Sequence, residues 1–406
     1  MRINNIMRND VFSVYQELTK DLIVPPITEH LYKTANEDLG RFIEGPINSY
    51  DQLRNFDFGP DNRRNVSCLS KYISHRILLE YDIIAQTLAL HSHDHVEKFI
   101  QEVFWRVYWK GWLEHRPTVW NDFVSFDFDN VSNSNYQNAI KGKTGIRCFD
   151  SWVNELRNRN YLHNHTRMWF ASIWIFTLGL PWQLGARFFM HHLLDGDAAS
   201  NTLGWRWVAG VQTAGKHYLA RSNNISRYTD GRFGDDKLNE EAAPCFDNTE
   251  HTTIPIDSAG GMAQKFNTLV VFDTDLHLEN ENIYEDYENV FVICLNNDER
   301  SIILSNNVLA FKRVLITDFL ARCQNASLCD PSNIMKIAST IEGFDVVYPF
   351  VGDNLDYLKR LQSLTNVTLH IRKRAEDLHC WQYAKKGFFN FKKQIPDIID
   401  TLGLRT

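Results

Sequence analysis

The hydrophobic pattern of this 406-residue chain changes near residue 265, and this change constrains its fold more than any other feature. Before it, apolar residues recur at three- and four-residue spacing, which indicates amphipathic helices. The clearest helical segments are 72–89, 96–113, 151–159 and 169–178. After it, short β-branched or apolar runs alternate with helical stretches, which favours a small parallel α/β domain. The runs are 268–272, 289–295, 345–350 and 367–371, and the helical stretches are 308–322, 334–341 and 355–364.

We therefore predict two domains, as the length also suggests. A mainly α-helical domain covers 1–240, a polar linker covers 241–263, and a Rossmann-like α/β domain covers 264–406. The second domain has no Gly-x-Gly-x-x-Gly turn, so a dinucleotide site of the usual kind is not indicated there.

Composition excludes some classes of protein. The net charge of −7 is carried by residues after 240, and residues 1–240 have no net charge. The overall charge therefore does not indicate a nucleic-acid partner. No apolar run is long enough to span a membrane, and the first residues lack a secretory signal. The seven cysteines are scattered, without a Cys-x-x-Cys pair. Free thiols in the cytoplasm are therefore expected.

Ten of the eleven tryptophans lie between Trp105 and Trp207, so indoles are concentrated in the helical domain. Within this region, Asp197, Asn201 and Trp205 are four residues apart. On a helix this spacing places a carboxylate, an amide and an indole on one face, where they could hold a planar redox-active ring. The alternative is that Asp197 is an N-terminal helix cap followed by ordinary aromatic core.

Other segments carry polar groups that could converge on the same ligand. Ser67 and Ser70 open a helix and could hold a phosphate or simply cap it. Glu102 and Arg106 form an i,i+4 pair beside Trp105, a spacing that is also common for surface ion pairs. His163, Asn164, His165 and Arg167 are crowded before an apolar helix, and because no third ligand has helical spacing, we expect no metal site.

Together these segments resemble the FAD-binding domain of the photolyase/cryptochrome family over roughly residues 40–230. NVSCLSKY is similar to the family's TSRLSPYL, and EVFWRVYW is similar to ELIWREFY. KGKTG is similar to EGKTG, and YLHNHTRM to WMHNRLRM. FFMHHLLDGDAASNTLGWRW is similar to FMxxLIDGDLAxNNGGWQW. The five matches are collinear and nearly constant in spacing.

The resemblance implies a U-shaped FAD and assigns roles by position. The implied FAD-binding residues are Tyr50, Ser67, Leu69, Ser70, Phe99, Arg106, Asn164, Arg167, Asp195, Asp197 and Asn201, with Arg167 paired to Asp195 and Asn201 facing flavin N5. The implied catalytic residues are Glu102, Asn164, Asn201, Trp205 and Trp182, the two tryptophans acting as proximal and middle electron donors. The implied substrate-binding residues are Trp105, Met168 and Trp207.

The resemblance also implies a function. We expect a light-driven lyase that splits pyrimidine dimers in UV-damaged DNA, single- or double-stranded, with the cyclobutane type favoured. A cryptochrome-like blue-light receptor and a helical scaffold that has lost FAD are the alternatives. The expected protein is a cytoplasmic monomer without a membrane partner, and its antenna chromophore is left unspecified.

The distal electron donor and the domain order depart from the family pattern. The distal electron donor falls at about Asp129, where only Phe126, Phe128 or Trp120 could substitute. The α/β domain follows the helical domain rather than preceding it, which indicates either a permuted antenna-like domain or an unrelated appended module. TLVVFDTDLHL faintly resembles the family's opening LVWFRxDLR. The motif Lys386–Lys392 could be a docking segment or the start of an amphipathic terminal helix.

Overall fold

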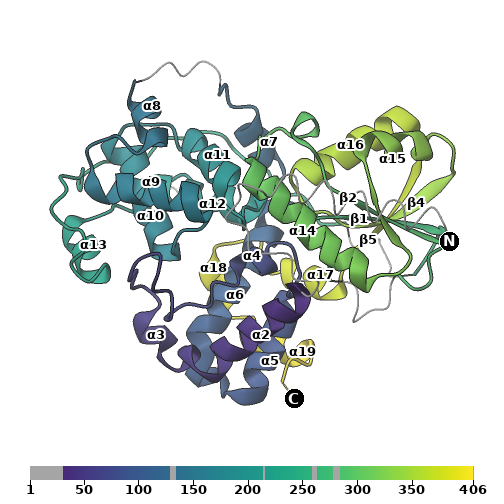
Figure 1. Cartoon of the computed structure of the whole chain (residues 1–406), viewed down its shortest axis with the longest axis horizontal. Coiled ribbons are helices and arrows are strands. Elements are labelled where there is room, and N and C mark those ends of the chain that lie inside the picture. The colour runs from purple at the N-terminus through teal and green to yellow at the C-terminus, as the bar shows by residue number, and fades with distance from the viewer. Residues whose placement is uncertain (1–30, 129–133, 214, 258–262, 278–283, 406) are drawn as a thin grey trace.

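The computed structural model describes residues 31–128, 134–213, 215–257, 263–277 and 284–405. Its first half is helical and its second half contains a sheet, so the predicted fold class is confirmed (Figure 1). The helices before the sheet are α2 (Leu31–Glu44), η1 (Pro46–Ser49), α3 (Tyr50–Leu53), α4 (Ser70–Ile73), α5 (Glu80–Leu90), α6 (His93–Glu114), α7 (Thr118–Val124), α8 (Ser134–Lys141), α9 (Arg147–Arg159), α10 (Asn164–Ser172), η2 (Ile173–Thr177), α11 (Trp182–His192), α12 (Ala198–Ala209) and α13 (Ser222–Tyr228).

The sheet has five parallel strands in the order β3-β2-β1-β4-β5. The strands are β1 (Thr268–Phe272), β2 (Asn289–Ile293), β3 (Ala326–Cys329), β4 (Gly343–Val347) and β5 (Thr368–Arg372). The helices of this half are η4 (Asn297–Glu299), α14 (Asn306–Arg322), α15 (Pro331–Ala338), α16 (Asp353–Thr365), α17 (Ala375–Trp381), α18 (Phe388–Lys392) and α19 (Ile395–Thr401). The sequence did not predict β3, because this four-residue edge strand is only partly buried and carries a weak hydrophobic signal.

Both faces of the sheet are buried, as expected for parallel strands. In β1, Leu269 and Val271 belong to one core cluster, together with α2, α5, α6 and α14. Val270 and Phe272 belong to the other, together with α9 to α12, α15 and α16. The helical half therefore packs directly on the α/β half through shared hydrophobic cores.

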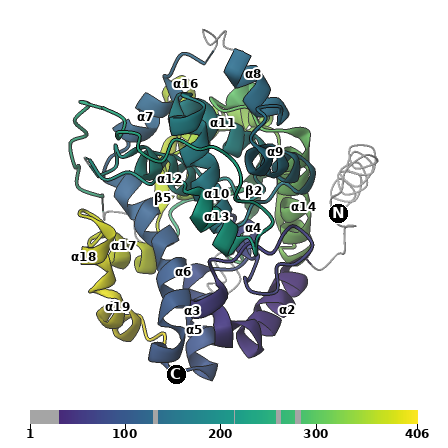
Figure 2. The same cartoon turned by 90° about the vertical axis from the view of Figure 1, so that its left-hand side faces the viewer.

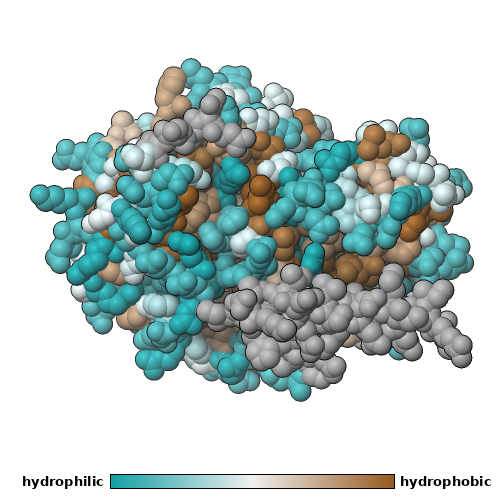
Figure 3. Space-filling model, turned by 45° about the horizontal axis from the view of Figure 1, so that its top comes forward, coloured by the Kyte–Doolittle hydropathy of each residue, from teal (hydrophilic) through white to brown (hydrophobic). Residues whose placement is uncertain are grey.

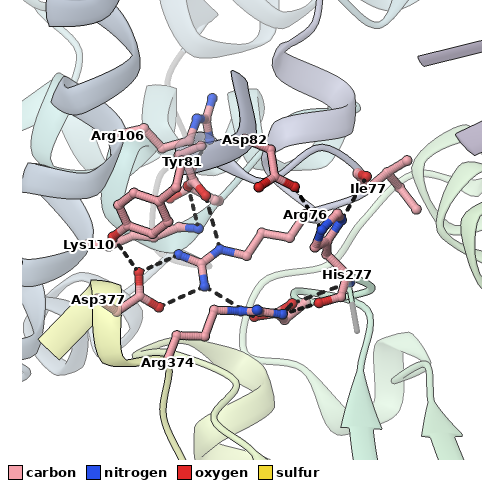
Figure 4. Close-up of polar contacts among 12 residues, drawn as sticks. Arg76, Ile77, Tyr81, Asp82, Arg106, Lys110, His277, Arg374 and Asp377 are labelled. Carbon is pink, nitrogen blue, oxygen red and sulfur yellow. Dashed lines mark hydrogen bonds and ion pairs between the residues drawn. The ribbon is translucent and has the colours of Figure 1, made fainter. Parts of the chain in front are cut away.

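The helix predicted over 72–89 is interrupted. Residues 74–79 form a turn between α4 and α5, and Arg76 in this turn has a positive φ of 51° and no exposed surface. Its guanidinium donates to Glu80, Asp275 and Asp377 at 2.7–3.1 Å (Figure 4). These carboxylates come from α5, from the loop after β1 and from α17, so one buried cation joins three parts of the chain. Hydrophobic periodicity alone could not reveal a break that serves an ionic contact.

The last helices pack on the helical half rather than on the sheet. Figure 2 shows α17, α18 and α19 along one side of α6. Gly111 in α6 makes this close approach possible, because a Cβ at Gly111 would lie 2.4 Å from the ring of Trp381. Whether the α/β half is a permuted antenna-like domain stays a prediction, as do the predicted domain boundaries.

The surface in Figure 3 is mostly hydrophilic, with apolar side chains in small groups. Within the described ranges, none of the helices has the length and apolar character needed to cross a bilayer.

Candidate functional site

A cavity of about 530 Å³ lies in the helical half of the molecule. Its walls come from α6, α10, α11 and α12, with the loop before α12 and the chain after α3 at its edge. Most of the residues singled out by the sequence line it: Glu102, Trp105, Arg106, Asn164, Arg167, Met168, Asp195, Asp197, Asn201, Trp205 and Trp207. This volume lies in the ordinary range for small-molecule and cofactor sites.

Helix α12 positions the residues at the centre of the cavity. Asp197 has extended backbone angles and is the N-cap of α12, since its Oδ1 accepts from the N–H of Ser200 at 2.8 Å. It therefore precedes the helix and does not belong to its side-chain face. The helix-cap interpretation is correct, and the same carboxylate also lines the cavity. Asn201 is held by a bond from its Nδ2 to the carbonyl of Ala186, 2.9 Å away on α11.

Two ion pairs fix charged groups in the cavity wall. Arg106 on α6 binds the second oxygen of Asp197. Arg167 on α10 binds Asp195 at 2.9 Å, so the pair implied by the family resemblance is present. Burial by itself raises the pKa of Asp195, but the guanidiniums of Arg167 and Arg106 outweigh it and hold the pKa below its ordinary value.

Glu102 has a different partner from the one predicted. Its Oε1 lies 3.1 Å from Nη1 of Arg54, whereas Arg106 turns to Asp197. The local ion pair between Glu102 and Arg106, which the sequence left open as an alternative, does not form, because each side chain binds a partner from another part of the chain. Burial raises the pKa of Glu102, and the opposing effect of Arg54 is smaller.

Aromatic side chains form the walls on either side of the cavity. Trp105 and Trp207 both line it, as does Met168. Each indole stacks on a further aromatic ring. The ring centroids of Trp207 and Tyr218 are 5.8 Å apart, and those of Trp105 and Phe388 are 3.6 Å apart. Phe388 belongs to α18, so the last part of the chain takes part in building this wall.

Trp205 is buried in the cavity wall, with Phe189 at 5.0 Å and Trp174 at 6.2 Å. Trp182, the predicted middle donor, is also buried and stacks on Phe123 at 5.8 Å. Phe123 lies 6.0 Å from Phe128, which in turn lies 5.3 Å from Phe126.

Aromatic rings therefore continue from Trp182 to Phe126 and Phe128, which are partly buried, and Trp120 lies 5.6 Å from Phe123. Asp129, at the expected distal position, lies outside the described residues.

The remaining predicted residues do not line this cavity. Tyr50 and Phe99 pack with Phe42 in an aromatic cluster, with ring centroids 5.0–5.7 Å apart. Leu69 has a fully buried side chain. Ser67 and Ser70 lie at the single-turn helix α4, where the hydroxyl of Ser67 accepts from the N–H of Leu69 at 3.5 Å. A role of these five residues in FAD binding stays a prediction.

Several lining residues had no clear signal in the sequence. Arg54 and Asn55 follow α3, Trp109 is one turn after Trp105, and Phe189 lies on α11. His165, which the sequence did single out, stacks on Trp169 at 4.1 Å and lines the cavity, while burial lowers its pKa. Trp109 has the helical spacing of Trp105, and this spacing is a signal that could have identified it.

The polar lining fits a ligand with hydrogen-bonding groups. Ser200 Oγ and Trp205 Nε1 are buried, and neither has a hydrogen-bond partner in the portion of the chain described. Both residues line the cavity. Because buried polar atoms are normally paired, these two favour a bound polar molecule such as FAD.

A second cavity, of about 60 Å³, lies between the two halves at the carboxyl edge of the sheet. Lys312 and Asn354 both donate to Asp273 there, at 2.5 and 2.8 Å. Glu114 of α6 accepts from Tyr348 at 2.6 Å and from the N–H of Val351 at 2.9 Å. Burial raises the pKa of Glu114 to about 7.

Comparison with known proteins finds similarity to DNA photolyases. Residues 99–232 match the family described as the FAD binding domain of DNA photolyase. The chain is 28% identical over 206 residues to a deoxyribodipyrimidine photo-lyase of Vibrio cholerae, covering 48% of this chain and 43% of that protein. It is 29% identical over 196 residues to the Escherichia coli protein of the same name, covering 46% and 41%.

A solved class III photolyase from Agrobacterium tumefaciens is 24% identical, with a TM-score of 0.43 over 52% of this chain and 47% of that one. The chain thus matches less than half the length of the two curated relatives.

Proposed function

Because residues 99–232 match the FAD binding domain of DNA photolyase, we propose that this chain is a light-driven DNA repair lyase. Its substrate would be a UV-induced pyrimidine dimer, of the cyclobutane type, in single- or double-stranded DNA. The observation that carries the proposal is the shared cavity. Residues with implied cofactor roles, Asp197 and Asn201, line the same space as Trp105 and Trp207, the residues with implied substrate roles.

FAD, when bound in its reduced form, supplies the electron that opens the dimer. The chain's own residues would hold and orient the two partners. Asp197 is fixed by the N–H of Ser200 and by Arg106, so its carboxylate presents a constant acceptor to the ring. The second N–H of the Asn201 amide is available to the same ligand, since the first is used by Ala186.

The substrate side would accept two adjacent bases of one strand, joined as a dimer and extruded from the duplex. A cofactor buried in a protein cannot reach a base that is still stacked, so the dimer must leave the duplex. Trp105 and Trp207 offer aromatic surfaces on which such bases stack, and base–aromatic stacking contributes about 1–3 kcal/mol per base. Glu102, with a raised pKa, would accept or share a proton at the edge of the base.

The experiment compares Glu102→Gln with wild type and with Asp94→Asn, an exposed carboxylate on the same helix. All three proteins should show flavin absorption. Under blue light, Glu102→Gln should repair dimer-containing oligonucleotides more slowly than wild type, by about tenfold or more, while Asp94→Asn repairs at the wild-type rate.

Repair by Glu102→Gln at the wild-type rate would contradict the role of Glu102. A colourless wild-type protein would contradict FAD binding. A yellow wild-type protein without repair activity would favour the light-receptor function instead.

A further inference from the structure

A short basic and aromatic segment, KKGFFNFKK at Lys385–Lys393, connects α17 to α19 and contains α18. Lys385, Lys386 and Lys393 are exposed, and no ion pair involves them within the part of the chain that the structure describes. Lys392 is paired with Glu97 of α6 at 3.3 Å. The segment therefore presents unneutralised positive charge to solvent on a chain with a net charge of −7.

The segment is firmly attached to α6. Phe388 and Phe391 are buried, and the Phe388 ring is nearly parallel to that of Trp105, with an interplanar angle of 13°. Tyr108 donates to the carbonyl of Lys386, and Arg116 donates to that of Lys385, both at 2.8 Å. These contacts fix the backbone that carries the lysines.

One aromatic residue of the segment is not used for this attachment. Phe389 is 79% exposed, whereas its neighbour Phe388 is 5% exposed. Among the large apolar side chains in the described ranges, only Phe246 is more exposed than Phe389. The exposed ring of Phe389 therefore lies between Lys386 and Lys392 in the sequence.

The segment also lies beside the large cavity. Phe388 stacks on Trp105, and Trp105 is part of the cavity wall. In Figure 2, α18 lies next to α6, the helix that carries Trp105 and Glu102. A polymer that placed one unit in the cavity would thus run close to the lysines.

We propose that residues 385–393 form a binding surface for a DNA strand next to the cavity. Lys385, Lys386 and Lys393 would neutralise phosphates, and Phe389 would stack on an unpaired base. A ring flanked by cations is the combination that single-stranded nucleic-acid sites use. A lipid surface is less suitable, because membrane-binding helices need a broad apolar face and this segment exposes a single ring. The inference rests on the proposed function, since a dimer-repair enzyme must bind the strand beside the lesion.

The test measures binding of an undamaged oligothymidylate by fluorescence anisotropy at several salt concentrations. We expect the triple variant Lys385→Gln/Lys386→Gln/Lys393→Gln to bind at least about tenfold more weakly. Its slope of log affinity against log salt should be smaller by about 2, as expected for three lost phosphate contacts on a single strand. Phe389→Ala should weaken binding by about five- to tenfold with an unchanged slope.

Matched controls come from α15 and α16 in the other half of the molecule. Lys336→Gln/Lys359→Gln removes two exposed lysines, and Leu364→Ala removes an apolar side chain that is 67% exposed. Both controls should bind like wild type. Flavin absorption in every variant verifies that the site and the fold are retained.

Equal binding by the segment variants and the controls would overturn the proposal, as would a wild-type protein that does not bind oligothymidylate. Loss of binding to phosphatidylserine vesicles, with DNA binding unchanged, would also overturn it and assign the surface to a membrane. Failure of the proposed function would give a result different from failure of the binding surface. A wild-type protein that binds DNA through this segment but does not repair dimers would support the surface and contradict the lyase activity.

Discussion

The large cavity of the helical half and the carboxyl edge of the sheet are both places where ligands bind in other folds. They differ in their free volume and in whether their polar groups are already paired. The helical cavity has about 530 Å³ of space, with aromatic walls and buried polar atoms that lack partners. The sheet edge lies at the switch point between β1 and β4, where open α/β sheets usually bind ligands. Its space is only about 60 Å³, and its charges are already paired with one another.

The difference follows from what covers each place. The sheet edge is closed by the turn after α4, by α6, by α11 and by the start of α12, and His75, Glu114 and Met190 of the helical half line the space that remains. A space of this size holds a few water molecules and excludes a ligand as large as a nucleotide. In this molecule the crevice of the sheet joins the two halves, and the ligand-sized cavity lies in the helical half.

Breaking the buried ionic cluster around Arg76 should have the largest effect. Arg76→Ala leaves Glu80, Asp275 and Asp377 short of one cation in a fully buried site (Figure 4). We expect the free energy of unfolding to fall by about 3–5 kcal/mol, measured by urea denaturation.

Arg360→Ala, which removes an exposed arginine of α16, is the matched control and should change it by less than about 0.5 kcal/mol. A loss below about 1 kcal/mol in Arg76→Ala would mean that the two halves are not held together by these charges.

The pH dependence of Glu114 should give the next largest effect. Its pKa is about 7 in the folded protein and near 4.5 in the unfolded chain, so between these values the folded state holds a proton that the unfolded state releases. The contribution of Glu114 to the free energy of unfolding should therefore fall as pH rises from 5 to 8, by about 2–3 kcal/mol. Buried histidines whose pKa is lowered, such as His75, contribute in the opposite direction, so the effect of Glu114 is read from the difference between variant and wild type.

Glu114→Gln should lack this contribution, so its stability at pH 8 relative to pH 5 should exceed that of wild type by about 2–3 kcal/mol. Glu342→Gln, which changes an exposed glutamate, should follow wild type. Thermal denaturation at pH 5 and pH 8 measures the difference. The same change between the two pH values in Glu114→Gln and in wild type would contradict the role of Glu114.

Gly185→Ala tests the large cavity of the helical half and should have a smaller effect. A Cβ at Gly185 would lie 2.2–2.9 Å from the indole of Trp205, so this ring would have to move within the cavity wall. We expect a loss of about 1–3 kcal/mol in stability and weaker retention of flavin on dialysis, followed by absorption at visible wavelengths.

The control is Gly40→Ala in helix α2, where an added Cβ would have no neighbouring atom within 4 Å. This substitution should instead stabilise the protein by about 0.5–1 kcal/mol. Unchanged flavin retention in Gly185→Ala would show that the position of Trp205 does not determine how the cofactor is held.

Much of the candidate site could be predicted because its residues lie in short, ordered motifs. Asp195, Asp197, Asn201, Trp205 and Trp207 fall within thirteen residues of the sequence, and all of them line one cavity. The i,i+4 interpretation of Glu102 and Arg106 failed, since Arg54, 48 positions before Glu102, was not visible as a partner. Arg76 and Phe388 were missed in the same way, because their partners come from the other half of the chain.

Sequence patterns alone indicate the two types of architecture and the kinds of side chain in the site. Periodicity separates helices from strands. The positions of carboxylates, amides and indoles indicate a planar redox-active ring, and the family resemblance implies that this ring is FAD. Tertiary contacts are needed to see which half keeps an open cavity, which charges pair, and that the end of the chain packs against Trp105. These outcomes depend on contacts between residues separated by up to about 300 positions, such as Arg76 with Asp377, and no local pattern encodes them.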